Sequence, residues 1–148
     1  RQLSAMPELV PLLRAEPGMV PKLIEEVMRF DPPTHALVRE ATRDVTFADT
    51  TLPKGSLVFL MLASAGRDAD HYRDPDTFDL NRSDCDHLSF GYGIHACVGM
   101  LLARREVAVA LKVLIDAFDT FRCPLPEQLD WNYALAARGV KHLPIRLS

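Results

Sequence analysis

Apolar residues recur at helical spacing near the start of the chain. Pro7–Ala15 is predicted to form a short helix that Pro17-Gly18 ends. A second helix is predicted over Val20–Phe30, because its apolar side chains share one helical face. That face consists of Val20, Leu23, Ile24 and Val27. Asp31-Pro32-Pro33 stops this helix, since a residue before proline disfavours helical backbone.

The longest apolar pattern lies nearer the C-terminus and predicts a helix over Val98–Phe118. Its polar residues form one narrow stripe, and nearly every other side chain from Met100 to Phe118 is apolar. The stripe consists of Arg105, Lys112, Asp116 and Asp119. A helix with so narrow a polar face is expected to be buried on most of its sides.

The middle of the chain has the alternation typical of β-structure. Val38–Phe47 is rich in β-branched residues, and Ala48-Asp49-Thr50 is predicted to turn it. Pro53-Lys54-Gly55 is predicted to form a second turn, followed by a buried strand over Ser56–Leu62. The segments Gly66–Arg82 and Leu143–Leu147 are expected to be a polar loop and a closing strand. The expected fold is therefore mainly α with small antiparallel β-sheets.

Composition narrows the class of protein. The chain has 148 residues, of which 48% are hydrophobic and 25% charged, and these globular values exclude a disordered chain. The formal net charge of −3 provides no field for binding nucleic acid or an anionic membrane. The longest uncharged stretch, His87–Ala103, is polar in its first half, so no membrane span is expected. Three irregularly spaced cysteines and no signal peptide favour a reduced, cytoplasmic compartment.

The most informative segment is Phe90–Gly99, with the sequence FGYGIHACVG. Gly91 and Gly93 allow positive φ angles and a close approach of backbone to a flat group. Cys97 precedes the long helix, whose N-terminus favours a deprotonated sulfur. Such a thiolate can be a nucleophile, a redox sensor or a metal ligand, whereas an isolated cysteine here is more often structural. The local residues by themselves leave these alternatives open.

The whole pattern F-G-x-G-x-H-x-C-x-G resembles the haem-binding signature of the cytochrome P450 family of haem-thiolate monooxygenases. The resemblance implies haem b, iron protoporphyrin IX, with Cys97 as its metal ligand and catalytic residue. It implies that Phe90 packs beside the sulfur, and that side chains at Gly91 and Gly99 would collide with the porphyrin or the loop. Backbone N–H groups around Cys97 are expected to donate to its sulfur.

The same resemblance assigns further cofactor contacts. His95 and Arg39 match positions that bind the haem propionates, and a guanidinium suits a carboxylate geometrically. Ala96 and Ala103 match positions against the face of the macrocycle. The segment Thr34–Val38, and the hairpin that joins Asn132–Ala136 to Arg138-Gly139-Val140, match regions that border the substrate pocket. His35 is assigned no chemical role.

Two interpretations compete for the helix segment that contains Glu25, Glu26 and Arg29. As i,i+4 pairs, Lys22–Glu26 and Glu25–Arg29 would form an ordinary solvated face. As the family's E-x-x-R motif, Glu26 and Arg29 would instead form a buried structural ion pair, which needs further hydrogen bonds. The family often provides another arginine at the position of Thr77, so Arg82 is the expected substitute, and the pair's third partner stays open.

The other candidates carry weaker signals. The Arg104-Arg105 pair matches either a basic patch for an electron donor or a solubilising helix face, with equal weight. Cys85 and Cys123 are expected to be ordinary thiols, and His87 to have a structural hydrogen-bonding role. His71 and His142 are expected at the surface.

The resemblance covers nearly the whole chain and implies residues 1–148 as the C-terminal haem-binding portion of a longer P450 domain. The upstream O₂-binding helix of that domain is not in these residues, and residue 1 is Arg. The implied partners are a small organic substrate, O₂ and a ferredoxin or flavoprotein electron donor. We expect this portion by itself to be inactive. The cysteine motif equally suits a peroxide-using or non-monooxygenating haem-thiolate enzyme, and a non-catalytic haem-binding module is the remaining alternative.

Overall fold

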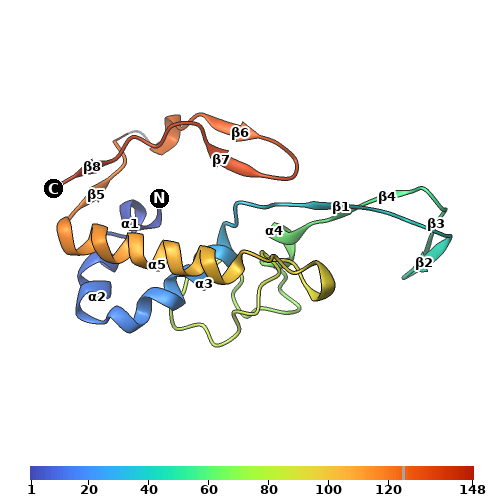
Figure 1. Cartoon of the computed structure of the whole chain (residues 1–148), viewed down its shortest axis with the longest axis horizontal. Coiled ribbons are helices and arrows are strands. Elements are labelled where there is room, and N and C mark those ends of the chain that lie inside the picture. The colour runs from blue at the N-terminus through green and yellow to red at the C-terminus, as the bar shows by residue number, and fades with distance from the viewer. Residues whose placement is uncertain (125) are drawn as a thin grey trace.

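A computed structural model describes residues 1–124 and 126–148 of the chain. A group of helices forms one end of the molecule, and a long β-ribbon extends from it toward the other end (Figure 1). The α-helices are α1 (Gln2–Ala5), α2 (Leu9–Ala15), α3 (Val20–Phe30), α4 (Leu62–Ala65) and α5 (Met100–Ala117). Short 3-10 turns are η1 (Pro17–Met19), η2 (Gly93–His95) and η3 (Pro126–Gln128).

The strands pair into small antiparallel sheets of two strands each. The pairs are β1 (Leu37–Glu40) with β4 (Leu57–Leu60), β2 (Val45–Phe47) with β3 (Thr50–Leu52), β5 (Phe121–Arg122) with β8 (Arg146–Leu147), and β6 (Trp131–Tyr133) with β7 (Arg138–Val140). The expected class, mainly α with small antiparallel sheets, is confirmed.

The predicted helices are present with small changes at their ends. Helix α3 has the predicted bounds, whereas α2 begins two residues after Pro7. Helix α5 begins at Met100, because Val98 and Gly99 still belong to the loop, and Met100 N–H donates to the Cys97 carbonyl at 3.2 Å. Helix α1 has too few residues to show an apolar period, so the pattern did not predict it.

The β-region departs from the prediction in two respects. The segment predicted as continuous β-structure over Val38–Phe47 divides into β1 and β2, each with its own partner strand. The turn predicted over Ala48-Asp49-Thr50 is confirmed at Ala48 and Asp49, whereas Thr50 already belongs to β3, and Ala48 has a positive φ of 49°. The prediction of a buried strand over Ser56–Leu62 is wrong, since β4 is largely exposed, with Leu57 at 63%. A ribbon of two strands is not covered on both faces by the described residues.

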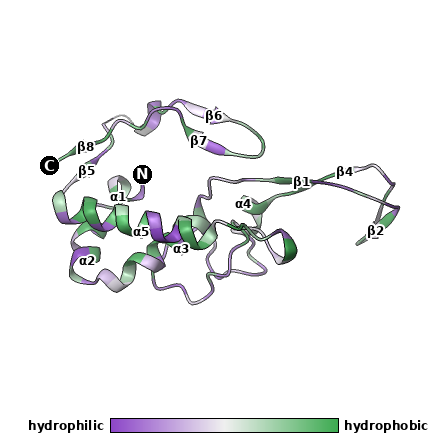
Figure 2. Cartoon of the chain, in the orientation of Figure 1, coloured by the Kyte–Doolittle hydropathy of each residue, from purple (hydrophilic) through white to green (hydrophobic). Residues whose placement is uncertain are grey.

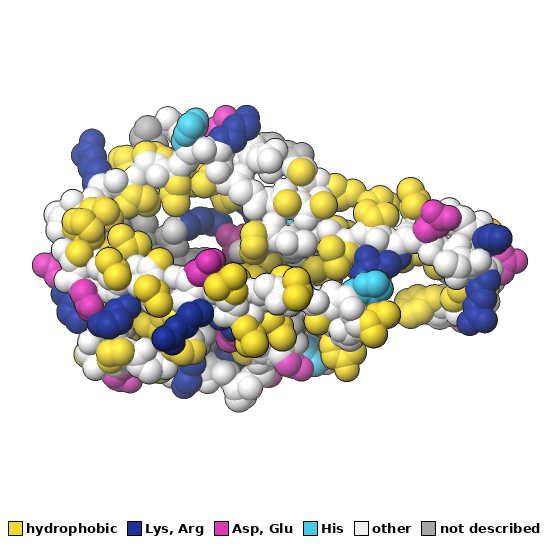
Figure 3. Space-filling view, viewed as in Figure 1, with side chains coloured by type: hydrophobic (Ala, Val, Ile, Leu, Met, Phe, Trp, Pro, Cys, Tyr) yellow, Lys and Arg dark blue, Asp and Glu magenta, His cyan; other side chains and the backbone are white. Residues whose placement is uncertain are grey.

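The core lies where α2, α3 and α5 meet. The buried cluster consists of Leu9, Val10, Leu13, Val20, Leu23, Ile24, Leu80, Ile115 and Phe121. Helix α5 contributes only Ile115 as a buried residue, so the expectation that it is buried on most sides is wrong for this chain. Leu102 is 62% exposed and Val113 61%. Hydrophobic and hydrophilic stretches alternate along the α5 ribbon (Figure 2), and hydrophobic side chains are exposed among charged ones over this part of the molecule (Figure 3). The spacing of apolar residues shows which face of a helix is able to be buried, but it does not show which other part of the structure covers that face.

Candidate functional site

The Phe90–Gly99 segment forms a closed loop directly before α5. Cys97 N–H donates to the Phe90 carbonyl at 2.7 Å, and Gly91 N–H donates to the Leu88 carbonyl at 2.8 Å. This closure needs the positive φ angles of Gly91 (73°) and Gly93 (64°). A Cβ at Gly91 would lie 3.1 Å from the His95 carbonyl oxygen, so the loop has no room for a larger residue there.

The loop presents Cys97 as an exposed residue. The neighbouring side chains Ile94 and Val98 are also fully open, at 96% and 104% exposure, and Ala96 is exposed too. Ala103 is half-buried on α5. A single available thiol among bare apolar side chains is a suitable donor set for a flat, largely apolar cofactor held by one sulfur ligand.

Two expectations about the loop receive no support from contacts within this chain. A Cβ at Gly99 would make only an ordinary contact of 3.9 Å with Cys97 Sγ, so the loop itself does not require glycine there. Among residues 1–124 and 126–148, no N–H group donates to Cys97 Sγ, and the Met100 N–H donates to the Cys97 carbonyl instead. A collision of a Gly99 side chain with a bound porphyrin stays a prediction.

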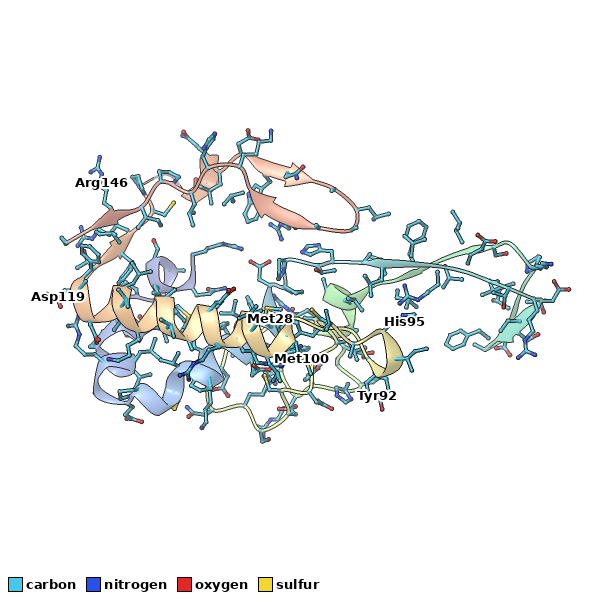
Figure 4. The ribbon with its side chains drawn as sticks, in the orientation of Figure 1. Met28, Tyr92, His95, Met100, Asp119 and Arg146 are labelled. Atoms are coloured by element: carbon cyan, nitrogen blue, oxygen red, sulfur yellow. The ribbon has the colours of Figure 1, made fainter. Side chains whose placement is uncertain are left out.

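Arg39 and His95 are 56 positions apart in the sequence, yet they line the same cavity of ≈ 440 Å³. Arg39 reaches it from β1, where it is exposed and donates to the Val38 carbonyl at 2.9 Å. His95 lies at the end of the η2 turn, near Tyr92 and beyond the N-terminal end of α5 (Figure 4). The two side chains thus border one cavity, and their binding of the haem propionates stays a prediction.

Glu26 and Arg29 form a buried ion pair, and the interpretation of this segment as a solvated face is wrong. Both side chains are at most 1% exposed, with Arg29 Nε 2.7 Å from Glu26 Oε2 and Nη2 2.8 Å from Oε1. Arg29 also donates to the carbonyls of Gly66, Pro75 and Thr77. These additional bonds satisfy the guanidinium, as a buried charge requires.

The third partner of this pair is Arg82, as the local sequence suggests. Arg82 Nε lies 3.6 Å from Glu26 Oε2, and Arg82 Nη2 donates to the Thr77 carbonyl at 3.0 Å. Sequence reasoning missed Gly66, where a Cβ would clash with the Arg29 carbonyl oxygen. The sequence offered no sign of this beyond the glycine itself, because the spacing of Gly66 and Arg29 does not show that their backbones pack together.

Glu25 does not pair with Arg29 but with Arg104, across the contact between α3 and α5. Arg104 Nε and Nη2 donate to the two Glu25 oxygens at 2.6 and 2.7 Å, and these bonds hold the pKa of Glu25 below its usual value. Arg104 is therefore paired within the chain, which argues against its place in an electron-donor patch. Arg105 is exposed. The Glu25–Arg104 contact was missed because nothing in their spacing of 79 residues indicates it.

His87 has the structural role that was expected. Its Nδ1 accepts the Ser89 N–H at 3.2 Å, so the ring proton of the neutral form is on Nε2. Nε2 lies 3.2 Å from Glu25 Oε2 but is not aligned for a hydrogen bond. Burial lowers the pKa of His87, the nearby Glu25 charge opposes this, and the ring is only 2% exposed.

The remaining cysteines and histidines are not assembled into a further centre. Within the described ranges, no three or more His, Cys, Asp or Glu side chains gather in a metal-binding arrangement. Cys85 and Cys123 are half-buried free thiols. His71 pairs with Asp86 at 3.0 Å on the surface, and His142 is exposed, as expected.

Comparison with known proteins decides the family. A profile of the family described as Cytochrome P450 matches residues 15–142. The chain belongs to the cytochrome P450 family. It is 37% identical over 146 residues to cytochrome P450 107B1 of Saccharopolyspora erythraea, covering 97% of this chain and 36% of that protein.

Two other relatives show the same extent of similarity. The mycinamicin IV hydroxylase/epoxidase of Micromonospora griseorubida is 37% identical over 146 residues, covering 97% of this chain and 37% of that protein. The structure of the tirandamycin C-bound P450 monooxygenase TamI aligns with a TM-score of 0.92 and 38% identity, covering 99% of this chain and 37% of that one. The chain thus spans little more than a third of the length of these P450 proteins.

The two segments expected to border the substrate pocket are hydrogen-bonded to each other. His35 N–H donates to the Ala136 carbonyl at 2.9 Å, and Arg138 N–H donates to the Pro33 carbonyl at 2.8 Å. The β6–β7 hairpin is thereby fixed to the segment that precedes β1. None of the described helices is both long and apolar enough to cross a membrane.

Proposed function

We propose that residues 1–148 form the C-terminal haem-binding portion of a haem-thiolate monooxygenase, which inserts one atom of O₂ into a small organic substrate. The observation that carries this proposal is the exposed Cys97 in the closed Phe90–Gly99 loop, together with the nearby cavity that both Arg39 and His95 line. The similarity to a mycinamicin IV hydroxylase/epoxidase supports oxygen insertion over the alternative haem-thiolate chemistries.

The proposed cofactor is haem b, which supplies iron for O₂ activation and a route for single electrons from a ferredoxin or flavoprotein donor. Cys97 would hold the iron through its sulfur. Arg39 and His95 would bind the propionates, since both line the same cavity and a guanidinium forms strong bonds to carboxylates. Phe90, Gly91, Ala96, Gly99 and Ala103 would provide a surface without bulky polar groups against which the macrocycle lies.

Other residues of this chain would support the site without contacting the cofactor. The Glu26–Arg29–Arg82 cluster holds the Gly66–Arg82 loop against α3, so that the cysteine loop keeps its place. The β6–β7 hairpin and the Thr34–Val38 segment would orient the substrate and exclude water from it. A cytoplasmic location stays a prediction, as does the inactivity of residues 1–148 by themselves.

The test uses the full-length protein that contains this chain. The ferrous carbon-monoxide complex is expected to show the red-shifted Soret band of a thiolate ligand, and Cys97→Ser should abolish it. Cys123→Ser is the matched control and should retain the band. Turnover under ¹⁸O₂ should place one labelled oxygen atom in the product. A histidine-type band in the unmodified protein, or a retained thiolate band in Cys97→Ser, would falsify the proposal.

A further inference from the structure

Arg104 occupies a site between an acidic side chain and an aromatic ring. Its guanidinium donates two parallel hydrogen bonds to Glu25, at 2.6 and 2.7 Å. The guanidinium carbon Cζ also lies 4.5 Å from the centre of the Phe90 ring. A planar cation that is oriented by a carboxylate and stacked on an aromatic face has little freedom to move. The Phe90 ring is therefore held by a group that is itself fixed to α3.

His87 contacts the same ring and the same carboxylate. Its ring centre lies 5.9 Å from that of Phe90, and its Nε2 lies 3.2 Å from Glu25 Oε2. The intervening Ser89 is buried, and its hydroxyl donates to the Met28 carbonyl at 2.5 Å. The backbone from His87 to Phe90 is thus attached to α3 through the bond to Met28, and the His87 ring lies beside the Glu25 carboxylate.

The groups around Phe90 are linked to Cys97 by a backbone hydrogen bond between these two residues. The Phe90 carbonyl accepts the Cys97 N–H at 2.7 Å, so a displacement of Phe90 displaces the cysteine as well. Phe90 is half-buried, and the Glu25 and Arg104 side chains are only 27% and 30% exposed. Their charges are consequently screened less than those of a surface pair.

We propose that Glu25, His87 and Arg104 form a positioning cluster, which holds Phe90 against the Cys97 loop and so determines the electronic environment of the cysteine ligand. The proposal rests on the proposed function, because it requires Cys97 to bind the haem iron. The members of the cluster do not touch Cys97 themselves. They act through Phe90 in the way that outer partners orient a metal ligand.

The experiment compares Arg104→Gln, Arg104→Lys and Glu25→Gln in the haem-loaded full-length protein. Arg104→Gln and Glu25→Gln should shift the reduction potential of the iron, reduce the fraction of thiolate-type carbon-monoxide complex and accelerate haem loss roughly tenfold. Arg104→Lys retains the charge opposite Glu25 but loses the planar stack on Phe90, so an intermediate effect is expected. It also provides a measurable variant if the glutamine variants do not fold.

Arg105→Gln is the matched control, because Arg105 is the next residue of α5 and is exposed. It should keep the potential and the band of the unmodified protein. The proposal is overturned if the haem-loaded fractions of Arg104→Gln, Arg104→Lys and Glu25→Gln keep that potential and band while only their thermal stability falls. Absence of the thiolate band from the unmodified protein would instead overturn the proposed function itself.

Discussion

The three cysteines have the same chemistry but differ in what surrounds each sulfur. Cys97 is exposed on the glycine loop, whereas Cys85 lies beneath the surface with its Sγ 3.8 Å from Glu26 Oε2. Burial, together with the Glu26 charge, raises the pKa of the Cys85 thiol from 9.0 to about 11. The motif identified Cys97 among the three, but only the packed environment shows why Cys85 is unsuited to act as a thiolate.

We predict that Cys85 in the folded full-length protein resists alkylation by iodoacetamide. A pKa raised from 9.0 to about 11 lowers the thiolate fraction about 100-fold at neutral pH, and the thiolate is the reacting form. The rate is measured by mass spectrometry against a cysteine peptide in the same solution. A peptide-like rate would contradict the prediction. Because the folded pKa exceeds the unfolded value, the stabilisation from the neutral thiol is complete below pH 9.0 and is lost as the pH rises toward 11.

At the scale of elements, helix α3 organises the surroundings of the site. One face of α3 carries apolar residues of the core. Among the polar residues of this helix, some are exposed to solvent and others are buried. Glu26 and Arg29 hold the Gly66–Arg82 loop, Glu25 binds α5, and Met28 accepts a bond from Ser89. Helical periodicity predicted the bounds of α3. It did not show which polar side chains are buried, because Lys22 and Glu26 lie one turn apart and only Lys22 is exposed.

Arg29→Ala should destabilise the full-length protein by about 3–5 kcal/mol, because it leaves the Glu26 carboxylate buried without its main partner. We expect low haem incorporation and a lowered midpoint in thermal unfolding, rather than a normal holoprotein with slow turnover. Lys22→Ala, at an exposed position of the same helix, is the control and should change the unfolding free energy by less than about 0.5 kcal/mol. Equal stability and haem content of the two variants would argue for the solvated-face interpretation.

At the scale of the whole molecule, the chain exposes more apolar surface than its composition suggests. Helix α5 carries Leu101, Leu102, Val109 and Val113 at 51–73% exposure, and the β1–β4 ribbon carries Leu57 and Phe59 at 63% and 45%. Large exposed apolar patches indicate surfaces that another structure covers. The chain spans about 36% of the length of a typical P450 relative, which agrees with cover from the remaining part of such a protein.

We predict that Val113→Glu destabilises the full-length protein, because it places a charge on an α5 face that the parent fold would bury. In residues 1–148 expressed alone, the same change should reduce self-association and binding of the dye ANS. Glu106→Gln, at an exposed polar position of the same helix, should change neither property. Thermal unfolding and dye fluorescence measure the two effects. An unchanged melting temperature of the full-length Val113→Glu variant would show that this face stays open.

The sequence by itself determined the local features of this protein: the bounds of α3, the turn at Ala48-Asp49, and the F-G-x-G-x-H-x-C-x-G motif that contains Cys97. Each depends on spacing or backbone freedom over a few residues, which a single sequence displays directly. The tertiary structure decided which distant groups come together: Arg39 and His95 border one cavity, Glu26 lies beside Arg82, and Glu25 pairs with Arg104 beside Phe90. Those contacts depend on how the helices and loops pack against one another. The spacing of side chains along one helix or strand does not show which residues of another element will lie opposite it.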